Sequence, residues 1–152
     1  MVDPYLVFLL DDRRHALHLS VVDRVVHMVY VTPLPGAPDI VLGVVDMRGR
    51  LMPVVDVRKR FGLPGRRPAP ADQLIVARMK QEPVALAVND TLGIVECADQ
   101  ERIPVSGILP GVPYCNGVIR TRDGLILIHD LDAFLSLTEA AALDRALDAA
   151  GR

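Results

Sequence analysis

The segment GVVDMRGRLMPVVDV, Gly43–Val57, is echoed further along the chain by GVIRTRDGLILIHDL, Gly117–Leu131. Aligned without a gap, the two segments keep Gly, Val, Arg, Leu and Asp in place, and aliphatic residues replace one another at many other positions. A second echo precedes each copy, because LPGAP at Leu34–Pro38 matches LPGVP at Leu109–Pro113. Two echoes in the same order and at a similar offset indicate that the chain is internally duplicated.

Short runs rich in Val and Ile, separated by turn residues, predict an all-β chain. In each copy two such runs flank a tight turn, Arg48–Arg50 in the first and Asp123–Gly124 in the second, which predicts a β-hairpin. An acid follows each hairpin, Asp56 and then Asp130, and is expected to cap a short helix. The expected strands are Tyr5–Leu10, Ala16–Val22, Val25–Val31, Val41–Met47, Leu51–Val55, Leu74–Met79, Val84–Val88, Ile94–Cys97, Gly117–Thr121 and Leu125–Ile128. Strands this short and this closely spaced favour small barrels, which leave few sticky edges exposed.

The length of 152 residues fits a single domain, 1–152, built from two fused halves. The echoes place the halves at about 15–62 and 74–137, with the Pro-, Gly- and Arg-rich segment 63–70 as the linker between them. A capping box at Ser136–Glu139 followed by Ala- and Leu-rich sequence predicts a C-terminal helix over about 138–150.

Composition narrows the class of protein. Hydrophobic residues make up 51% of the chain, which is ample for a core, and the formal charge of −2 gives no general attraction to nucleic acid or anionic lipid. No apolar run reaches the roughly 18 residues needed to span a bilayer, and the N-terminus lacks the pattern of a signal peptide. Cys97 and Cys115 lie outside any CxxC motif and are expected to be free, buried thiols of a cytoplasmic protein.

The sequence carries no residue pattern typical of catalysis, so we expect neither an enzyme nor a cofactor or metal site. His15 and His18 fall in an expected strand, where a spacing of three directs their side chains to opposite faces and disfavours a metal pair. His129 precedes Asp130, as in half of a catalytic triad. Ser106, however, lies in IPVSGIL, which is not a nucleophile-elbow context.

One basic cluster stands out between Arg48 and Arg67, where seven Lys or Arg residues face one acid, Asp56. On a small β-barrel such a strip could bind single-stranded RNA, although Phe61 is the only aromatic residue within it and base stacking requires rings. A solvated rim and a contact surface for an acidic protein partner are the other interpretations. Many apolar strand residues without a reactive constellation favour a protein that presents sheet faces to other proteins.

The opening segment resembles the hallmark of the CheW-type coupling proteins of bacterial chemotaxis. The matching stretches are Gly43–Gly49 (GVVDMRG), Pro53–Arg58 (PVVDVR) and Phe61–Gly62, where the family has roughly G-V-[IV]-N-[LV]-R-G, P-[IV]-[IV]-D-L-R and F-G. Four further segments agree in order with the family: His15–Val29, the proline-rich Pro33–Pro38, Val84–Glu96 and Asn116–Leu131. The resemblance extends from about Tyr5 to Leu137, nearly the whole chain.

The resemblance implies a fold and a role. The fold is two five-stranded, SH3-like β-barrels packed on a shared core, with short helices and a C-terminal helix. The role is that of a non-catalytic cytoplasmic adaptor, recruited to receptor arrays. Such an adaptor bridges the cytoplasmic tip of a methyl-accepting chemoreceptor and the CheW-like regulatory domain of a CheA-type histidine kinase. In the family, the receptor tip sits in the groove between the barrels and barrel ends pair with the kinase domain.

The resemblance also implies a partner-binding site at the receptor and kinase interface. Its residues, carried over by motif, are Val22, Arg24, Gly43, Arg48 and Gly49. Arg24 stands where many members have Glu, so the charge at that edge is reversed, which affects the choice of partner more than the fold. The sequence does not choose between flagellar, surface-motility, biofilm and second-messenger outputs.

Overall fold

The computed structural model describes residues 1–104 and 114–151, and the second echo at 109–113 lies outside them. The strands are β1 (Val2–Leu10), β2 (Arg13–His18), β3 (Val22–His27), β4 (Val41–Met47), β5 (Arg50–Val55), β6 (Gln73–Met79), β7 (Glu82–Val88), β8 (Asp90–Ala98), β9 (Arg102–Ile103), β10 (Cys115–Thr121) and β11 (Gly124–His129). The α-helices are α1 (Val57–Arg60) and α2 (Leu137–Ala149), and the 3-10 turns are η1 (Leu19–Val21), η2 (Asp99–Glu101) and η3 (Leu131–Ala133).

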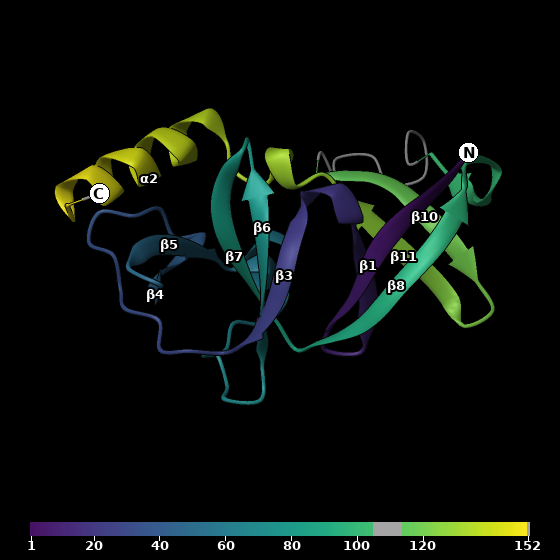
Figure 1. Ribbon diagram of the computed structural model, residues 1–152, viewed down its shortest axis with the longest axis horizontal. Helices are drawn as coiled ribbons and strands as arrows, with labels where there is room; N and C mark the ends of the chain where they lie inside the picture. The colour runs from purple at the N-terminus through teal and green to yellow at the C-terminus, as the bar shows by residue number, and fades with distance from the viewer. Residues whose placement is uncertain (105–113, 152) are drawn as a thin grey trace.

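The strands form two sheets that curl into two barrels, as predicted. Barrel A has six strands rather than the expected five, in the order β8-β1-β2-β11-β10-β9, and barrel B has the expected five, in the order β3-β6-β7-β5-β4. The barrels lie side by side along the long axis, with the N-terminus at the outer end of barrel A and the C-terminus at the outer end of barrel B (Figure 1).

The sheets do not follow the expected halves 15–62 and 74–137. Barrel B is continuous in sequence, and the two N-terminal strands close barrel A by pairing β1 with β8 and, in parallel, β2 with β11. Segment 63–70 therefore connects β5 to β6 within barrel B rather than linking the barrels. The connections between the barrels are η1 and the single residue Asn89, between β7 and β8.

The register shows that the duplication extends beyond the hairpins. Strands β11 and β2 pair in parallel as β5 and β7 do, so the β1–β2 hairpin of barrel A is equivalent to the β6–β7 hairpin of barrel B. The bulge between β1 and β8 recurs between β6 and β3, and the bulge before Gly43 in β4 recurs before Gly117 in β10. Each of the five strands of barrel B is therefore matched by a strand of barrel A, which has the short strand β9 in addition.

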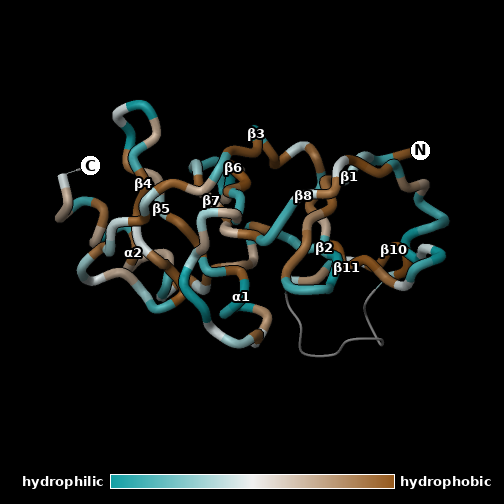
Figure 2. Tube along the Cα trace, turned by 90° about the horizontal axis from the view of Figure 1, so that it is seen from below, coloured by the Kyte–Doolittle hydropathy of each residue, from teal (hydrophilic) through white to brown (hydrophobic). Residues whose placement is uncertain are grey.

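One hydrophobic cluster joins the two barrels. It contains Leu6 and Phe8 from β1 together with Ile75 and Leu86 from β6 and β7, all buried, and it extends to α2 through Leu143. Hydrophobic stretches run through the strands of both barrels (Figure 2). The shared core implied by the family resemblance is thus present.

The expected helix caps form, but some expected strands end early. Asp56 accepts a hydrogen bond from the Lys59 backbone at the start of α1, and Ser136 and Glu139 form the capping box of α2. The expected strand Ala16–Val22 stops at His18, because the His18 side chain accepts a hydrogen bond from the Ser20 backbone N–H and caps η1. A side chain that bonds locally to the backbone competes in this way with the strand ladder.

Candidate partner-binding surfaces

The β4–β5 hairpin turn places Arg48 and Gly49 at one end of barrel B. Their φ angles are 54° and 85°, and a two-residue turn with both central residues left-handed matches the twist of the flanking strands. The Gly49 N–H donates to the Asp46 carboxylate at 2.8 Å, so Asp46 holds the backbone of the turn. The exposed Arg48 side chain makes no hydrogen bond or ion pair with any residue of 1–104 or 114–151. Arg48 is therefore available to a partner.

Gly43 is buried in β4 and has a packing role. Thr32 and Val44 form a bridge with two backbone hydrogen bonds of 2.8 Å, which brings the Thr32 carbonyl against Gly43. A Cβ added at Gly43 would lie well under 3.0 Å from the Thr32 carbonyl oxygen, closer than real Cβ atoms approach a neighbour. Gly43 thus fixes the position of β4 and offers no side chain to a partner.

Val22 and Arg24 lie on the edge strand β3. Val22 is half-buried against the core, Arg24 is exposed, and Asp23 between them is bulged and paired with Arg78 at 2.6 Å. Because β3 runs antiparallel to β6, and β5 runs parallel to β7, Val22 and the β4–β5 turn lie at the same end of barrel B. The sheet order separates β3 from β5 by two strands, so the five predicted residues do not form one compact cluster.

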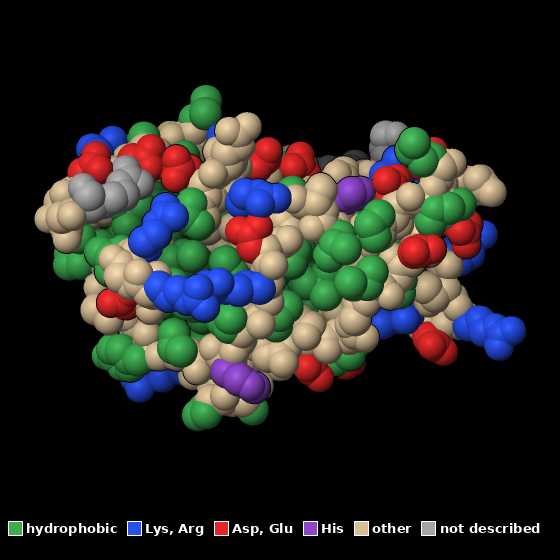
Figure 3. Space-filling view, viewed as in Figure 1, with side chains coloured by type: hydrophobic (Ala, Val, Ile, Leu, Met, Phe, Trp, Pro, Cys, Tyr) green, Lys and Arg blue, Asp and Glu red, His purple; other side chains and the backbone are tan. Residues whose placement is uncertain are grey.

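A more extensive apolar surface lies along strand β8. None of the five residues carried over by motif belongs to this strand. Residues 92–96 are exposed in an unbroken run, with exposed fractions of 50% for Leu92, 58% for Ile94 and 36% for Val95. Strand β8 is an edge strand of barrel A, β3 is an edge strand of barrel B, and these edges face the same side of the junction (Figures 1 and 2). Hydrophobic side chains gather on this face of the molecule beside β3 (Figure 3). Uncovered apolar edges of this kind mark interaction sites.

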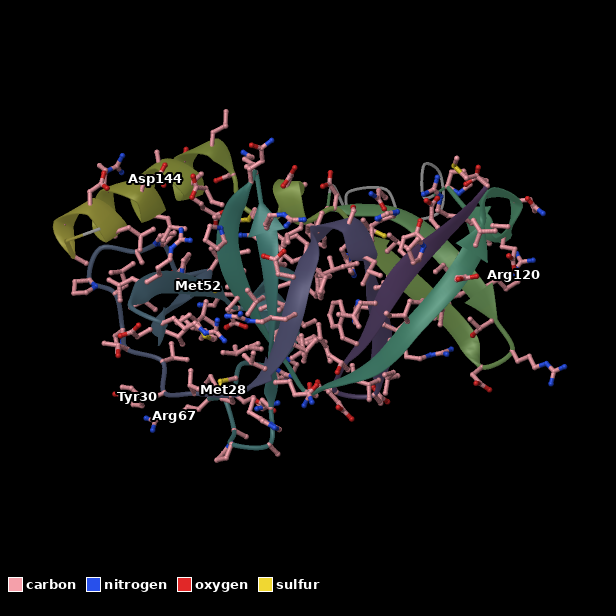
Figure 4. The ribbon with its side chains drawn as sticks, in the orientation of Figure 1. Met28, Tyr30, Met52, Arg67, Arg120 and Asp144 are labelled. Atoms are coloured by element: carbon pink, nitrogen blue, oxygen red, sulfur yellow. The ribbon has the colours of Figure 1, made fainter. Side chains whose placement is uncertain are left out.

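A second surface surrounds Tyr30, the only exposed aromatic side chain among the three Tyr and three Phe residues of the chain, all of which the structure describes. Tyr30 is 82% exposed and borders an open hollow of about 760 Å³. Met28, Tyr30 and Arg67 lie together at the lower end of barrel B, and Tyr30 and Arg67 project outward (Figure 4). The rest of the lining comes from Val29, Val31, Pro33, Leu42, Pro68, Ala69 and Pro70. Tyr, Met and Arg are the residue types enriched where proteins bind one another.

Three of the seven basic residues of the cluster, Arg58, Arg60 and Arg66, form internal ion pairs. The Arg58 guanidinium donates to both oxygens of Asp11, at 2.6 and 3.1 Å, and to the Pro64 carbonyl, and the bonds to Asp11 hold the pKa of that carboxyl below its usual value. Arg60 pairs with Glu139 and Arg66 with Asp72, each at 2.9 Å. A continuous basic strip for RNA therefore does not form, and no observation favours that alternative.

A pair of buried histidines lies where the barrels meet. His15 Nδ1 and His129 Nε2 are 2.8 Å apart, and both rings stack on Phe61. Burial lowers the pKa of His15 to about 4 and that of His129 to about 3, so both rings are neutral at pH 7. The described residues contain no group of three or more His, Cys, Asp or Glu that could hold a metal ion. These histidines are part of the packing, and the parallel pairing of β2 with β11 brings them together.

Paired SH3-like barrels with an uncovered apolar edge define a class of protein-interaction modules. Residues 4–139 match the family model described as CheW-like domain, and the chain belongs to that family, as the hairpin motif predicts. The chemotaxis protein CheW of Rhizobium meliloti is 27% identical over 139 residues, 90% of each chain. That of Thermotoga maritima is 26% identical over 130 residues, 86% of this chain and 85% of the relative. The crystal structure of the scaffolding protein TtCheW from Thermoanaerobacter tengcongensis has the same fold, with a TM-score of 0.83, 24% identity and coverage of 91% and 96%.

No helix in the described ranges is both long and apolar enough to cross a membrane.

Proposed function

We propose that this protein is a non-catalytic cytoplasmic adaptor that couples a chemoreceptor to a CheA-type histidine kinase within receptor arrays. The observation that carries the proposal is the exposed apolar strip on β8, which lies on the same side of the molecule as the edge strand β3 (Figures 1 and 2). An exposed apolar edge does not contribute to the folding stability of the monomer. When a partner covers it, the burial of apolar surface contributes favourably to the free energy of binding.

The receptor tip docks along this strip. The family resemblance implies that this tip is a helical hairpin. Leu92 and Ile94 on β8 supply the apolar wall of the site, and Val22 and Arg24 on β3 supply the opposite wall. An acidic side chain on the receptor would pair with Arg24, which is exposed and has no ion-pair partner in the described chain.

The kinase regulatory domain docks at a barrel end, and the Tyr30 surface fits that role. Tyr30 provides a rigid ring with an exposed face, Met28 and the nearby prolines provide apolar area, and Arg67 provides a charge at the rim. Because Tyr30 and Ile94 lie on different surfaces, receptor and kinase can bind at the same time.

Calorimetry with the isolated receptor tip and the isolated kinase regulatory domain tests both assignments. Ile94→Glu is expected to weaken receptor binding at least tenfold and to leave kinase binding unchanged, and Tyr30→Ala is expected to do the reverse. Leu125→Glu is the matched control for Ile94→Glu, because Leu125 is a similarly exposed strand residue, at 54%, away from the β3–β8 junction. Absence of binding to either partner by the wild-type protein would refute the adaptor role.

A further inference from the structure

The matched barrels contain two equivalent hollows, one beside each repeated hairpin. In barrel B the hollow measures about 400 Å³ and lies between the β4–β5 and β6–β7 turns, with Leu51 and Pro53 in its lining. In barrel A a hollow of about 350 Å³ lies between the β10–β11 and β1–β2 turns, with Leu125 and Leu127 in its lining. Leu51 and Leu125 are equivalent by register, because each follows the first residue of its strand after the hairpin turn.

A helix of this chain covers the hollow of barrel B. Residues Leu143 and Leu147 of α2 line it, one turn apart on the buried face of the helix. The Arg60–Glu139 ion pair, in which one Arg60 nitrogen lies 2.9 Å from both carboxylate oxygens, fastens the start of α2 to barrel B. The structure therefore shows what kind of element fits this site: a short amphipathic helix with leucines four residues apart and acidic residues beside them.

The equivalent hollow of barrel A has no such cover within 1–104 and 114–151. Leu125 is 54% exposed, and its equivalent Leu51, in the hollow beside α2, is less exposed at 39%. The rim carries Arg13 and Arg14 with Asp12 and Asp123. Arg14 is held by a 2.7 Å hydrogen bond to Thr121, whereas Arg13 has no ion-pair partner in the described chain.

We propose that the hollow of barrel A is a docking site for an amphipathic helix of a partner protein. Leucines at positions i and i+4 of that helix face Leu125 and Leu127, as Leu143 and Leu147 line the hollow of barrel B together with Leu51 and Pro53. A carboxylate on its flank pairs with Arg13, just as Glu139 of α2 pairs with an arginine of barrel B. This surface is separate from the β3–β8 junction and from Tyr30, so the proposal does not depend on the adaptor's receptor or kinase sites.

The probe is a synthetic peptide of residues 136–151, which contains α2 with its capping box, titrated into the full-length ¹⁵N-labelled protein. We expect saturable shifts in the amide signals of the barrel A hollow, including those of Asp12, Leu125 and Leu127. Shifts confined to the barrel B hollow would mean that the peptide only exchanges with the chain's own α2. That result, or the absence of saturable shifts at millimolar peptide, would overturn the proposal.

Two variants make the test specific. Leu125→Glu is expected to weaken peptide binding at least tenfold, and Arg13→Glu at least threefold, both in proteins whose spectra and melting remain those of the wild type. Val2→Glu, a substitution at a similarly exposed position on β1, 53% exposed and outside every proposed site, is the matched control and is expected to bind the peptide as the wild type does. Equal affinity of the Leu125→Glu and Val2→Glu variants would refute the site.

Discussion

Replacing Gly43 by alanine is expected to destabilise the protein far more than the same change at its equivalent, Gly117. The methyl group added at Gly43 would press against the backbone oxygen of Thr32, and backbone cannot rotate away as a side chain can. Relief requires that the Thr32–Val44 bridge separate, which loses two backbone hydrogen bonds. At about 1 kcal/mol for each bond and about 1–3 kcal/mol for overpacking, the expected loss is about 3–5 kcal/mol.

At Gly117 the nearest atoms to an added Cβ, at 3.1 Å, belong to the flexible side chain of Arg102. That side chain can move aside, so Gly117→Ala is expected to cost no more than about 1 kcal/mol. Thermal and urea unfolding of the two variants measures the difference, and Gly43→Ala is expected to melt about 10 °C below Gly117→Ala. Equal melting temperatures for the two variants would show that the close approach of the Thr32 carbonyl is not the reason why position 43 requires a glycine.

Three further outcomes are expected. Arg48→Asp should change the free energy of unfolding by at most about 0.5 kcal/mol, because this arginine is exposed and unpaired in the described chain, yet weaken binding of the receptor tip by about 2 kcal/mol, because the family resemblance implies that an arginine here faces the receptor. Paired melts and titrations, with Arg122→Asp as the control in the other hairpin, separate these effects, and an early-melting Arg48→Asp would contradict the assignment. Arg58→Ala should lower the free energy of unfolding by about 2 kcal/mol, since two acceptors lose a charged donor; a loss below about 0.5 kcal/mol in urea would contradict this. Stability should fall as the pH drops from 6.5 toward 4, because unfolding restores the ordinary pKa of 6.5 to His15 and His129; a double Phe variant should flatten this dependence in melts across that range.

Local sequence signals predict the hairpins and the caps well. The observed bounds of β4, Val41–Met47, coincide with the expected strand, because Val-rich sequence ends at a turn whose residues tolerate left-handed angles. Asp56 caps α1 and Ser136 caps α2 as expected, since a cap depends on residues within one helical turn. The resemblance of the hairpin motif to the CheW family adds the two-barrel fold, which is confirmed.

Long-range pairing could not be predicted from the same signals. The closure of barrel A depends on the pairing of His15 in β2 with Leu127 in β11, residues separated by most of the chain. Neither segment alone specifies its partner strand. The expected halves were therefore placed from the repeated sequence segments, which do not show how the strands pair. The buried contact of His15 with His129 follows from that pairing and was missed for the same reason. The sequence also did not predict that the apolar side chains of β8 are exposed, because adjacent residues such as Ile94 and Val95 are typical of a buried strand.

The two edge strands occupy equivalent places in the duplicated fold, but their surfaces differ. After the shared bulge, Arg24 of β3 and Gly93 of β8 occupy equivalent positions, opposite Val76 and Val7 respectively. The next residues are also equivalent, but Val25 is half-buried whereas Ile94 is 58% exposed. One wall of the junction is therefore charged and partly covered, and the other is apolar and open. A partner helix whose faces differ in the same way can bind in one orientation only, because the reverse orientation buries an unpaired guanidinium against apolar surface.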